Sequence, residues 1–327
     1  MKCTNKVISS GLILCLIVSL TACNGKKDDV SNAYNIYQNT DITNISASLD
    51  EGTSYYGANL CVGGMENIGT QTTDSQVAEG AGVFNTATGT ITYAQNIYAK
   101  LYPASTTKIL TAYIAIKYGN LDDIVTVSEN AVNLASDSSK CNLTAGDKMT
   151  LRDLLYGLMM RSGNDAAIAI AEHISGDTES FAALMNEEAA RLGATGSHFV
   201  NPNGLPDDNH YTTVYDLYLF FQEALAEDTF YQILSTTNYT TNYTHSDGSA
   251  ATMDWVSTNQ YLAHTETAPD GFTVIGGKTG TTGEAGYCLV LLSNNANNQP
   301  IISIVLKADC KSNLYLLMNQ ILVGYGN

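Results

Sequence analysis

The stretch Leu101-Tyr-Pro-Ala-Ser-Thr-Thr-Lys-Ile-Leu-Thr111 predicts both the fold and the chemistry of this chain. Ser105 and Lys108 are three positions apart within it, and apolar residues follow at helical spacing. Pro103 suits a helix start, because proline is tolerated in or just before the first turn. A helix that begins here brings the Ser105 hydroxyl and the Lys108 amine to one face, about one turn apart.

This pair of side chains can do nucleophilic chemistry under one condition. An unaided serine is a poor nucleophile near neutral pH, so it needs a base within hydrogen-bond reach. Lys108 is such a base only if burial or a second cation lowers its pKa. By itself, S-x-x-K more often marks an ordinary helix start with an exposed lysine, so companion motifs have to decide between the two.

The composition limits the classes of partner. The chain has 327 residues and 44% hydrophobic content, enough for one large domain or two modest ones. Its net charge is −17, and no basic run follows Lys26-Lys27. Nucleic acid is therefore a poor candidate partner. An anionic ligand would need a local cationic site that works against the overall field.

Residues 1–22 have the features of a signal peptide. A basic start precedes the apolar run Gly11–Leu20, which is too short to span a membrane as a stable helix. The end of this segment, Leu20-Thr-Ala-Cys23, resembles the lipobox of bacterial lipoproteins, whose chain is cut before a cysteine that carries the lipid. We therefore predict an extracytoplasmic protein anchored to the membrane through lipidated Cys23. A plain secretory peptide is the alternative, and a Cys23→Ala variant that still partitions with membranes would favour it.

Residues 23–76 are predicted to be a flexible tether, because they are rich in Asn, Thr, Ser, Gly and Asp and show little periodicity. The catalytic domain is expected to occupy residues 77–327. Outside the signal peptide and the anchor, the cysteines show no C-x-x-C spacing, so a zinc site is not indicated. Export permits disulfides, but we prefer buried free thiols. These cysteines are Cys61, Cys141, Cys288 and Cys310.

The domain has strand patterns at both ends and helical patterns between them. An N-terminal hairpin is predicted from Ala81–Asn85 and Thr90–Tyr93. The predicted helices are 105–118, 154–160, 165–174, 178–192, 213–226 and 313–323, with a short strand at 124–127. Further strands are predicted at 272–275, 285–292 and 301–306. This order indicates an α+β fold, with one antiparallel sheet built from both termini and a helical insertion.

Two further motifs accompany Ser105 and Lys108. Ser162-Gly-Asn164 follows in the middle of the chain, and Lys278-Thr-Gly280 comes late. S-x-N is common in this chain, but S-x-x-K and K-T-G each occur once and in the right order. This trio is typical of penicillin-binding proteins and class A β-lactamases.

From about Ala81 to Leu306 the chain resembles the D-alanyl-D-alanine carboxypeptidases, the low-molecular-mass penicillin-binding proteins of peptidase family S11. The resemblance implies a DD-peptidase/serine β-lactamase-like fold that needs no metal or organic cofactor. It also implies a serine peptidase that removes the terminal D-alanine of peptidoglycan stem peptides ending in D-Ala-D-Ala and is covalently inhibited by β-lactams. The segments that carry it are 101–108, 158–167, 201–213, 277–281 and 285–289.

The resemblance also implies roles for individual residues. Ser105 would attack the carbonyl between the two D-alanines and become the acyl-ester, while Lys108 takes its proton. Ser162 would pass a proton to the leaving amine, and Asn164 would hydrogen-bond the substrate amide. Lys278 would add a second positive charge that disfavours protonation of Lys108.

The K-T-G segment would bind the rest of the substrate. Thr279, together with Lys278, suits the terminal carboxylate of the peptide, and Gly280 belongs to the same substrate-binding strand. The backbone N–H groups of Ser105 and Thr281 would form the oxyanion hole. Some relatives hold the carboxylate with an arginine after the last strand; this chain has none beyond Arg191, and Lys311 is a possible substitute.

Two alternative functions remain. A class A β-lactamase needs a glutamate to hydrolyse the acyl-enzyme, and no glutamate stands in an E-x-x-L-N context here, since the matching stretch is Ser197–Leu205. We therefore expect slow release of penicillin. A non-catalytic penicillin-binding wall lipoprotein that keeps the fold is the other alternative, and the intact Ser105, Lys108 and Lys278 disfavour it. His210 is interpreted as structural.

Overall fold

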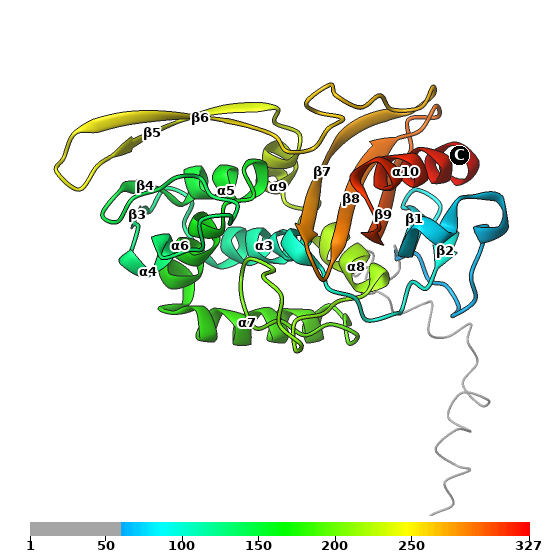
Figure 1. Cartoon of the computed structure of the whole chain (residues 1–327), viewed down its shortest axis with the longest axis horizontal. Coiled ribbons are helices and arrows are strands. Elements are labelled where there is room, and N and C mark those ends of the chain that lie inside the picture. The colour runs from blue at the N-terminus through cyan, green and yellow to red at the C-terminus, as the bar shows by residue number, and fades with distance from the viewer. Residues whose placement is uncertain (1–59) are drawn as a thin grey trace, which may run out of the picture. The chain divides into compact units, whose positions relative to one another are not determined.

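The structure, a computed structural model, describes residues 60–327. The predicted signal peptide and Cys23 lie outside these residues. Figure 1 shows a sheet at one side and a helical region with a second, smaller sheet at the other. The α-helices are α3 Lys108–Tyr118, α4 Glu129–Val132, α5 Leu151–Met160, α6 Asn164–Ser175, α7 Thr178–Arg191, α8 Val214–Ala224, α9 Asp228–Leu234 and α10 Lys311–Tyr325.

The main sheet joins the two ends of the domain, as predicted. Its five antiparallel strands lie in the order β2-β1-β9-β8-β7, so the first strands pair with the last. In the β1–β9 register, Ala81 is opposite Val305. Strand β7 forms one edge of this sheet. The strands are β1 Ala78–Asn85, β2 Thr90–Gln95, β7 Thr273–Thr282, β8 Gly286–Asn294 and β9 Pro300–Ala308.

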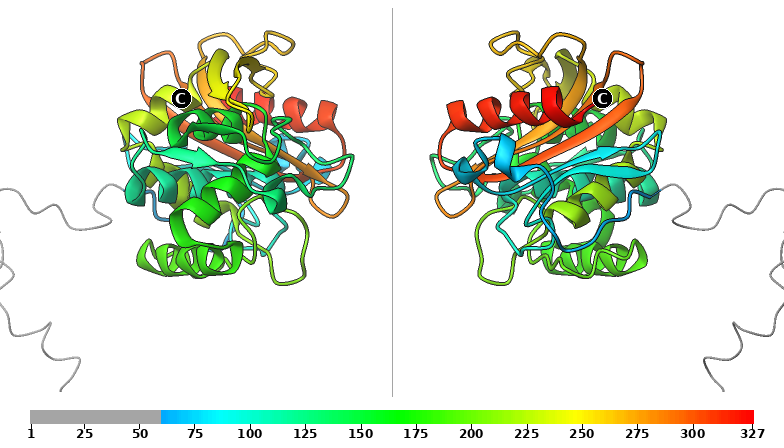
Figure 2. Two further views of the ribbon diagram at one scale, coloured as in Figure 1. Left: turned by 90° about the vertical axis from the view of Figure 1, so that its left-hand side faces the viewer. Right: turned by 90° about the vertical axis from the view of Figure 1, so that its right-hand side faces the viewer.

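Both faces of the main sheet are covered. Along β9, Ile302 and Ile304 belong to the core shared with α3 and α8, whereas Ile301 and Val305 belong to the core under α10. Figure 2 shows α10 lying across one face with the helical region on the other. Because burial on two faces removes the usual alternation of apolar and polar residues, β8 and β9 read as continuous apolar runs in the sequence.

The helical insertion follows the sequence signals closely. Thr150 and Asp153 form a capping box at the start of α5. Helices α6 and α7 end before Gly176 and Gly193, whose φ angles of 89° and 75° suit glycine. Helix α9, which follows α8, was not predicted from the sequence. The helix that contains Ser105 differs in one respect: its first turn is a 3₁₀ turn, η4 Ala104–Thr107, and the α-helix begins at Lys108.

The prediction of a single sheet is incomplete, because the insertion carries a sheet of its own. Its strands lie in the order β3-β4-β5-β6, and Figure 1 shows β5 and β6 as a long hairpin at the end of the molecule. The segment 238–256 is rich in Thr, Asn and Tyr, and only Thr241 and Trp255 in it are buried, so its core-facing side gives a weak strand signal. The bounds are β3 Ile124–Thr126, β4 Lys148–Thr150, β5 Asn238–Thr244 and β6 Ala250–Val256.

The folded unit begins upstream of Val77, because residues 60–76 pack on it. Cys61 is fully buried, and its backbone N–H donates to the Tyr218 hydroxyl at 2.8 Å. Ile68 pairs with Ala94 beside β2. The start of the domain was predicted at residue 77 because a polar composition indicates flexibility. Backbone hydrogen bonds can nevertheless hold such a polar segment in place. All four cysteines of the described part are free, and Cys310 is exposed rather than buried.

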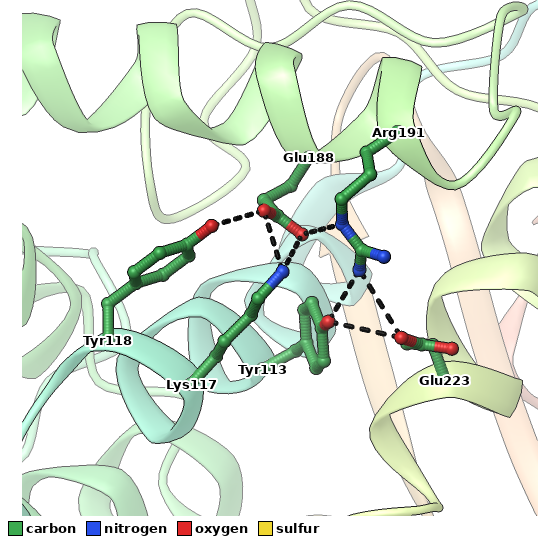
Figure 3. Close-up of polar contacts among 6 residues, drawn as sticks. All are labelled: Tyr113, Lys117, Tyr118, Glu188, Arg191 and Glu223. Atoms are coloured by element: carbon green, nitrogen blue, oxygen red, sulfur yellow. Dashed lines mark hydrogen bonds and ion pairs between the residues drawn. The ribbon is translucent and has the colours of Figure 1, made fainter.

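A buried carboxylate joins three helices of the insertion (Figure 3). Glu188 of α7 is 3% exposed and accepts hydrogen bonds at 2.8 Å from Lys117 of α3 and from Arg191. Arg191 in turn donates to Glu223 of α8 at 3.3 Å. Burial raises the pKa of Glu188, but the hydrogen bonds from Lys117, Tyr118 and Arg191 outweigh it and hold the pKa below its ordinary value.

This arrangement predicts a pH-dependent contribution to stability. We expect Glu188→Gln to lower the free energy of unfolding at pH 7 by about 1.5–3 kcal/mol, because charge-assisted hydrogen bonds are lost. A carboxyl with a lowered folded-state pKa contributes above its unfolded pKa of about 4.3, and the contribution disappears as the pH falls through the folded-state pKa. The difference between wild type and variant should therefore shrink below about pH 4 in urea titrations. Glu187→Gln, an exposed neighbour on α7, serves as the control; an equal loss there would contradict this account.

No helix within residues 60–327 is long and apolar enough to cross a membrane.

Candidate active site

A strained turn presents the Ser105 hydroxyl. Ala104, the residue before it, has a φ angle of 47°, in the left-handed region that residues other than glycine rarely adopt. Gly204 packs directly against this turn: a Cβ at that position would lie 1.8 Å from the Ala104 carbonyl oxygen. Glycine is therefore required at position 204 for the loop to support the turn.

Lys108 lies beneath Ser105 and is fully buried. Its Nζ is 2.8 Å from Ser105 Oγ, 2.8 Å from Asn164 Oδ1 and 2.7 Å from the Asn203 carbonyl oxygen. Burial holds the pKa of Lys108 well below its ordinary value, and the positive charge of Lys278 lowers it further. A neutral amine has two hydrogens and one lone pair. If the hydrogens go to Asn164 Oδ1 and Asn203 O, the lone pair is left for the Ser105 hydroxyl proton.

The second lysine sits on the edge strand β7 and faces the same site. Lys278 is fully buried, and its Nζ donates to Ser162 Oγ at 2.9 Å and to the Thr279 carbonyl at 2.8 Å. Burial lowers the pKa of Lys278 to about 7. Ser162, like Ala104, has a left-handed backbone conformation, with a φ angle of 57°. Such backbone strain clusters at functional sites.

Gly280 explains how β7 approaches the nucleophile so closely. A Cβ at position 280 would lie 2.9 Å from the Ser105 backbone nitrogen. Because β7 is the edge of the sheet, its outer backbone groups face this turn rather than another strand. The arrangement leaves an edge to which an extended peptide can add.

Two cavities meet at Ser105. The first, of about 250 Å³, is lined among others by Ser162, Thr279 and Lys311, and we call it the Lys311 cavity. The second, of about 270 Å³, is lined among others by Asn164 and Glu284, and we call it the Glu284 cavity. A substrate whose reacting bond lies at Ser105 would extend into both.

The comparison with known families agrees with this geometry. The profile of peptidase family S11, described as D-alanyl-D-alanine carboxypeptidase, matches residues 68–310. This protein belongs to that family. The family assignment predicted from the motifs is thereby confirmed, and so is its α+β fold.

Individual members of the family are similar over the same region. D-alanyl-D-alanine carboxypeptidase DacF of Bacillus subtilis is 34% identical over 232 residues, 68% of this chain and 56% of that protein. The D-alanyl-D-alanine carboxypeptidase of Streptomyces sp. strain K15 is 34% identical over 239 residues, 70% of this chain and 80% of that one. The crystal structure of the Streptomyces K15 DD-transpeptidase has a TM-score of 0.68 at 33% identity, covering 76% of this chain and 97% of that one. The matched region is thus little more than half of DacF.

Within this S11 peptidase, the structure brings together all the predicted site residues of the described part. Ser105 lines both cavities, and Lys108 and Lys278 bond to hydroxyls that line them. The remaining predicted residues line one or both cavities: Ser162, Asn164, Thr279, Gly280 and Thr281.

Three contributors were not predicted as site residues. The Asn203 carbonyl accepts from Lys108, and Thr258 Oγ1 lies 2.9 Å from Thr279 Oγ1. Gln260 also lines the Lys311 cavity. Asn203 lies in the segment 201–213 that carries the resemblance, but a backbone acceptor leaves no signature in side-chain type. Thr258 and Gln260 belong to no motif that could have marked them.

His210 supports the turn that carries Ser105. It is 1% exposed, and the Val200 backbone N–H donates to its Nδ1 at 3.2 Å. The ring proton is therefore on Nε2, which donates to Thr107 Oγ1 at 2.9 Å. Burial lowers the pKa of His210 to about 4, so the ring is neutral near pH 7. The geometry agrees with the structural role expected from the sequence.

Proposed function

We propose that this protein is a serine-type D-Ala-D-Ala carboxypeptidase that acts on peptidoglycan stem peptides. The observation that carries the proposal is the 2.8 Å contact between Ser105 Oγ and the buried Lys108 amine, at the junction of two cavities. The low pKa of Lys108 supports its role as base, because an amine must be unprotonated to accept a proton.

Acylation would proceed in the following way. Ser105 Oγ attacks the carbonyl carbon of the penultimate D-alanine while its proton moves to Lys108 Nζ. The negative charge that develops on the carbonyl oxygen is stabilised by the backbone N–H groups of Ser105 and Thr281. The loss of one such donor typically costs about 10²–10³ in rate. The C–N bond then breaks, and the peptide remains as an ester on Ser105. The proton that Lys108 accepted moves through Ser162 to the leaving amine, which leaves Lys108 neutral again.

Deacylation would release the shortened peptide. A water molecule attacks the ester carbon and gives one proton to Lys108 Nζ. The bond between the ester carbon and Ser105 Oγ then breaks, and Lys108 gives this proton to Ser105 Oγ. The Glu284 cavity contains carboxylates at its rim, but a β-lactamase glutamate in the expected sequence context is absent from Ser197–Leu205. We therefore expect slow hydrolysis of the penicilloyl ester.

The carboxylate of the departing D-alanine is assigned to the Lys311 cavity. Thr279 and Lys311 line this cavity, and Lys278 lies directly behind it, bonded to Ser162. No acidic side chain of residues 60–327 lines it. A local cationic site of this kind can bind an anion in spite of the net charge of −17. We propose Lys311 as the substitute for the arginine that some relatives have after the last strand.

Release of D-alanine tests the proposed function. Incubation of the purified chain with a pentapeptide ending in D-Ala-D-Ala should yield one equivalent of free D-alanine, and fluorescent penicillin should label the protein in a long-lived complex. Labelling without any release of D-alanine would indicate a non-catalytic penicillin-binding lipoprotein. Rapid turnover of penicillin would indicate a β-lactamase.

We propose that the catalytic domain is held outside the cell membrane by lipid on Cys23. Only the sequence Leu20-Thr-Ala-Cys23 supports this part of the proposal. Two or more acyl chains give stable membrane attachment. An anchor of this kind would keep the catalytic domain close to a substrate in the cell wall.

A further inference from the structure

The Glu284 cavity is acidic, in contrast to the Lys311 cavity. Asp137 and Glu284 both line it, and no lysine or arginine of residues 60–327 does. Asp207 and Asp208 directly follow Pro206, which also lines this cavity. Tyr102, just before the nucleophile turn, donates to Asp208 Oδ1 at 3.1 Å. Lys140 likewise directly follows the lining residue Ser139, so acidic residues outnumber basic ones at and next to this cavity.

The Asn164 side chain offers a hydrogen-bond donor to this cavity. The Asn164 side chain is 4% exposed, and its Oδ1 is used by Lys108. Its amide nitrogen donates to no acceptor within residues 60–327, yet the side chain lines the Glu284 cavity. This nitrogen is not among the buried atoms that lack a partner, so it is open to the cavity, where a bound molecule can supply an acceptor. A peptide carbonyl has the required chemistry.

The two cavities together give the direction of the substrate. The leaving D-alanine carries a carboxylate, which suits the cavity with Lys311 and is repelled by the one with Asp137 and Glu284. The acyl-donor part of the peptide must then run through the Glu284 cavity past Asn164. The side chain of the residue that precedes D-Ala-D-Ala is consequently placed near these carboxylates.

We propose that the Glu284 cavity selects acyl donors whose residue before D-Ala-D-Ala has a cationic side chain. A diamino acid with a free terminal ammonium and no neighbouring carboxylate, such as L-lysine, is preferred over one with a distal carboxylate, such as meso-diaminopimelate. This inference rests on the proposed carboxypeptidase function and adds its substrate class. Asp137 and Glu284 are exposed, so each should favour the cation about two- to fivefold, or about 4- to 25-fold together.

Two substrates that differ in one group test the preference. Nα-acetyl-L-lysyl-D-Ala-D-Ala is compared with the same peptide carrying 6-hydroxynorleucine, in which a hydroxyl replaces the ammonium at nearly constant shape. The ratio of their kcat/KM values for D-alanine release should be about 4–25 at low salt. The ratio should fall toward one as salt screens the exposed charges.

Matched variants assign the preference to this cavity. In the double variant Asp137→Asn, Glu284→Gln the ratio of the two kcat/KM values should collapse to near one. The control Glu129→Gln, Glu187→Gln removes two exposed charges elsewhere and should keep the wild-type ratio. Equal kcat/KM values for the two substrates in wild type would overturn this inference but not the carboxypeptidase function. The same holds if the control variant lowers the ratio as much as the double variant does. No release from either substrate would overturn the carboxypeptidase function and the inference with it.

Discussion

Ser105→Ala should reduce the release of D-alanine by about 10⁴-fold or more, and should abolish labelling by fluorescent penicillin. The effect is large because the substitution removes the atom that forms the acyl-ester, so no covalent path remains. The fold should persist, since Ser105 is only half-buried and Lys108 keeps its contacts with Asn164 and Asn203. A thermal melt of the variant checks this point.

The control for this prediction is Ser180→Ala, an exposed serine on α7 remote from the cavities. It should leave both D-alanine release and penicillin labelling unchanged. If Ser105→Ala still formed a stable penicilloyl ester, the nucleophile would have to be another hydroxyl. Ser162, 2.9 Å from the Lys278 amine, would then be the candidate.

Short-range patterns explain why so much of the site was visible in the sequence. The three-residue spacing of Ser105 and Lys108 specifies their proximity on any helical turn, whether 3₁₀ or α. The final hairpin was equally clear, because continuous apolar strands separated by a polar turn are a strong signal. In both cases neighbours in the sequence are neighbours in space.

The features that the sequence did not reveal depend on contacts between distant segments. The acidic Glu284 cavity combines Asp137 from the loop before β4 with Glu284 from the turn between β7 and β8. Neither residue belongs to a motif. The second sheet was missed for a related reason, because the face of β5 and β6 that packs on the core is only partly apolar and mostly half-buried, so their pairing depends on the partner strand more than on their own pattern.

The support under the nucleophile is also a tertiary property. Two residues of the loop that follows α7 contact the turn that carries Ser105. Gly204 can pack against Ala104 because it has no side chain, and His210 is hydrogen-bonded to Thr107 Oγ1. The same loop supplies the Asn203 carbonyl that accepts from Lys108. A single loop thus fixes the strained turn and orients the base, which explains why the resemblance to S11 peptidases extends through residues 201–213.

Lys108→Gln is expected to lower the rate of acylation by penicillin about 10²–10⁴-fold, the usual contribution of a general base. Glutamine keeps an amide donor for Asn164 Oδ1 or Asn203 O but has no lone pair that can accept the Ser105 proton at neutral pH. Stopped-flow labelling measures this rate without any contribution from deacylation. Lys148→Gln, an exposed lysine on β4, is the matched control and should acylate like wild type. A rate for Lys108→Gln within tenfold of wild type would show that another group takes the proton.

The pH dependence of acylation gives the same role an independent test. Because Lys108 must be unprotonated to act, the wild-type rate should fall as the pH drops through its lowered pKa. Lys278 is one cause of that low pKa, so Lys278→Gln should move this acidic limb to higher pH, since removal of a like charge makes protonation of Lys108 easier. A limb that stayed in place would mean that burial alone sets the pKa of Lys108. A limb that moved to lower pH would contradict the assignment of Lys108 as the base, because no loss of positive charge beside an amine lowers its pKa.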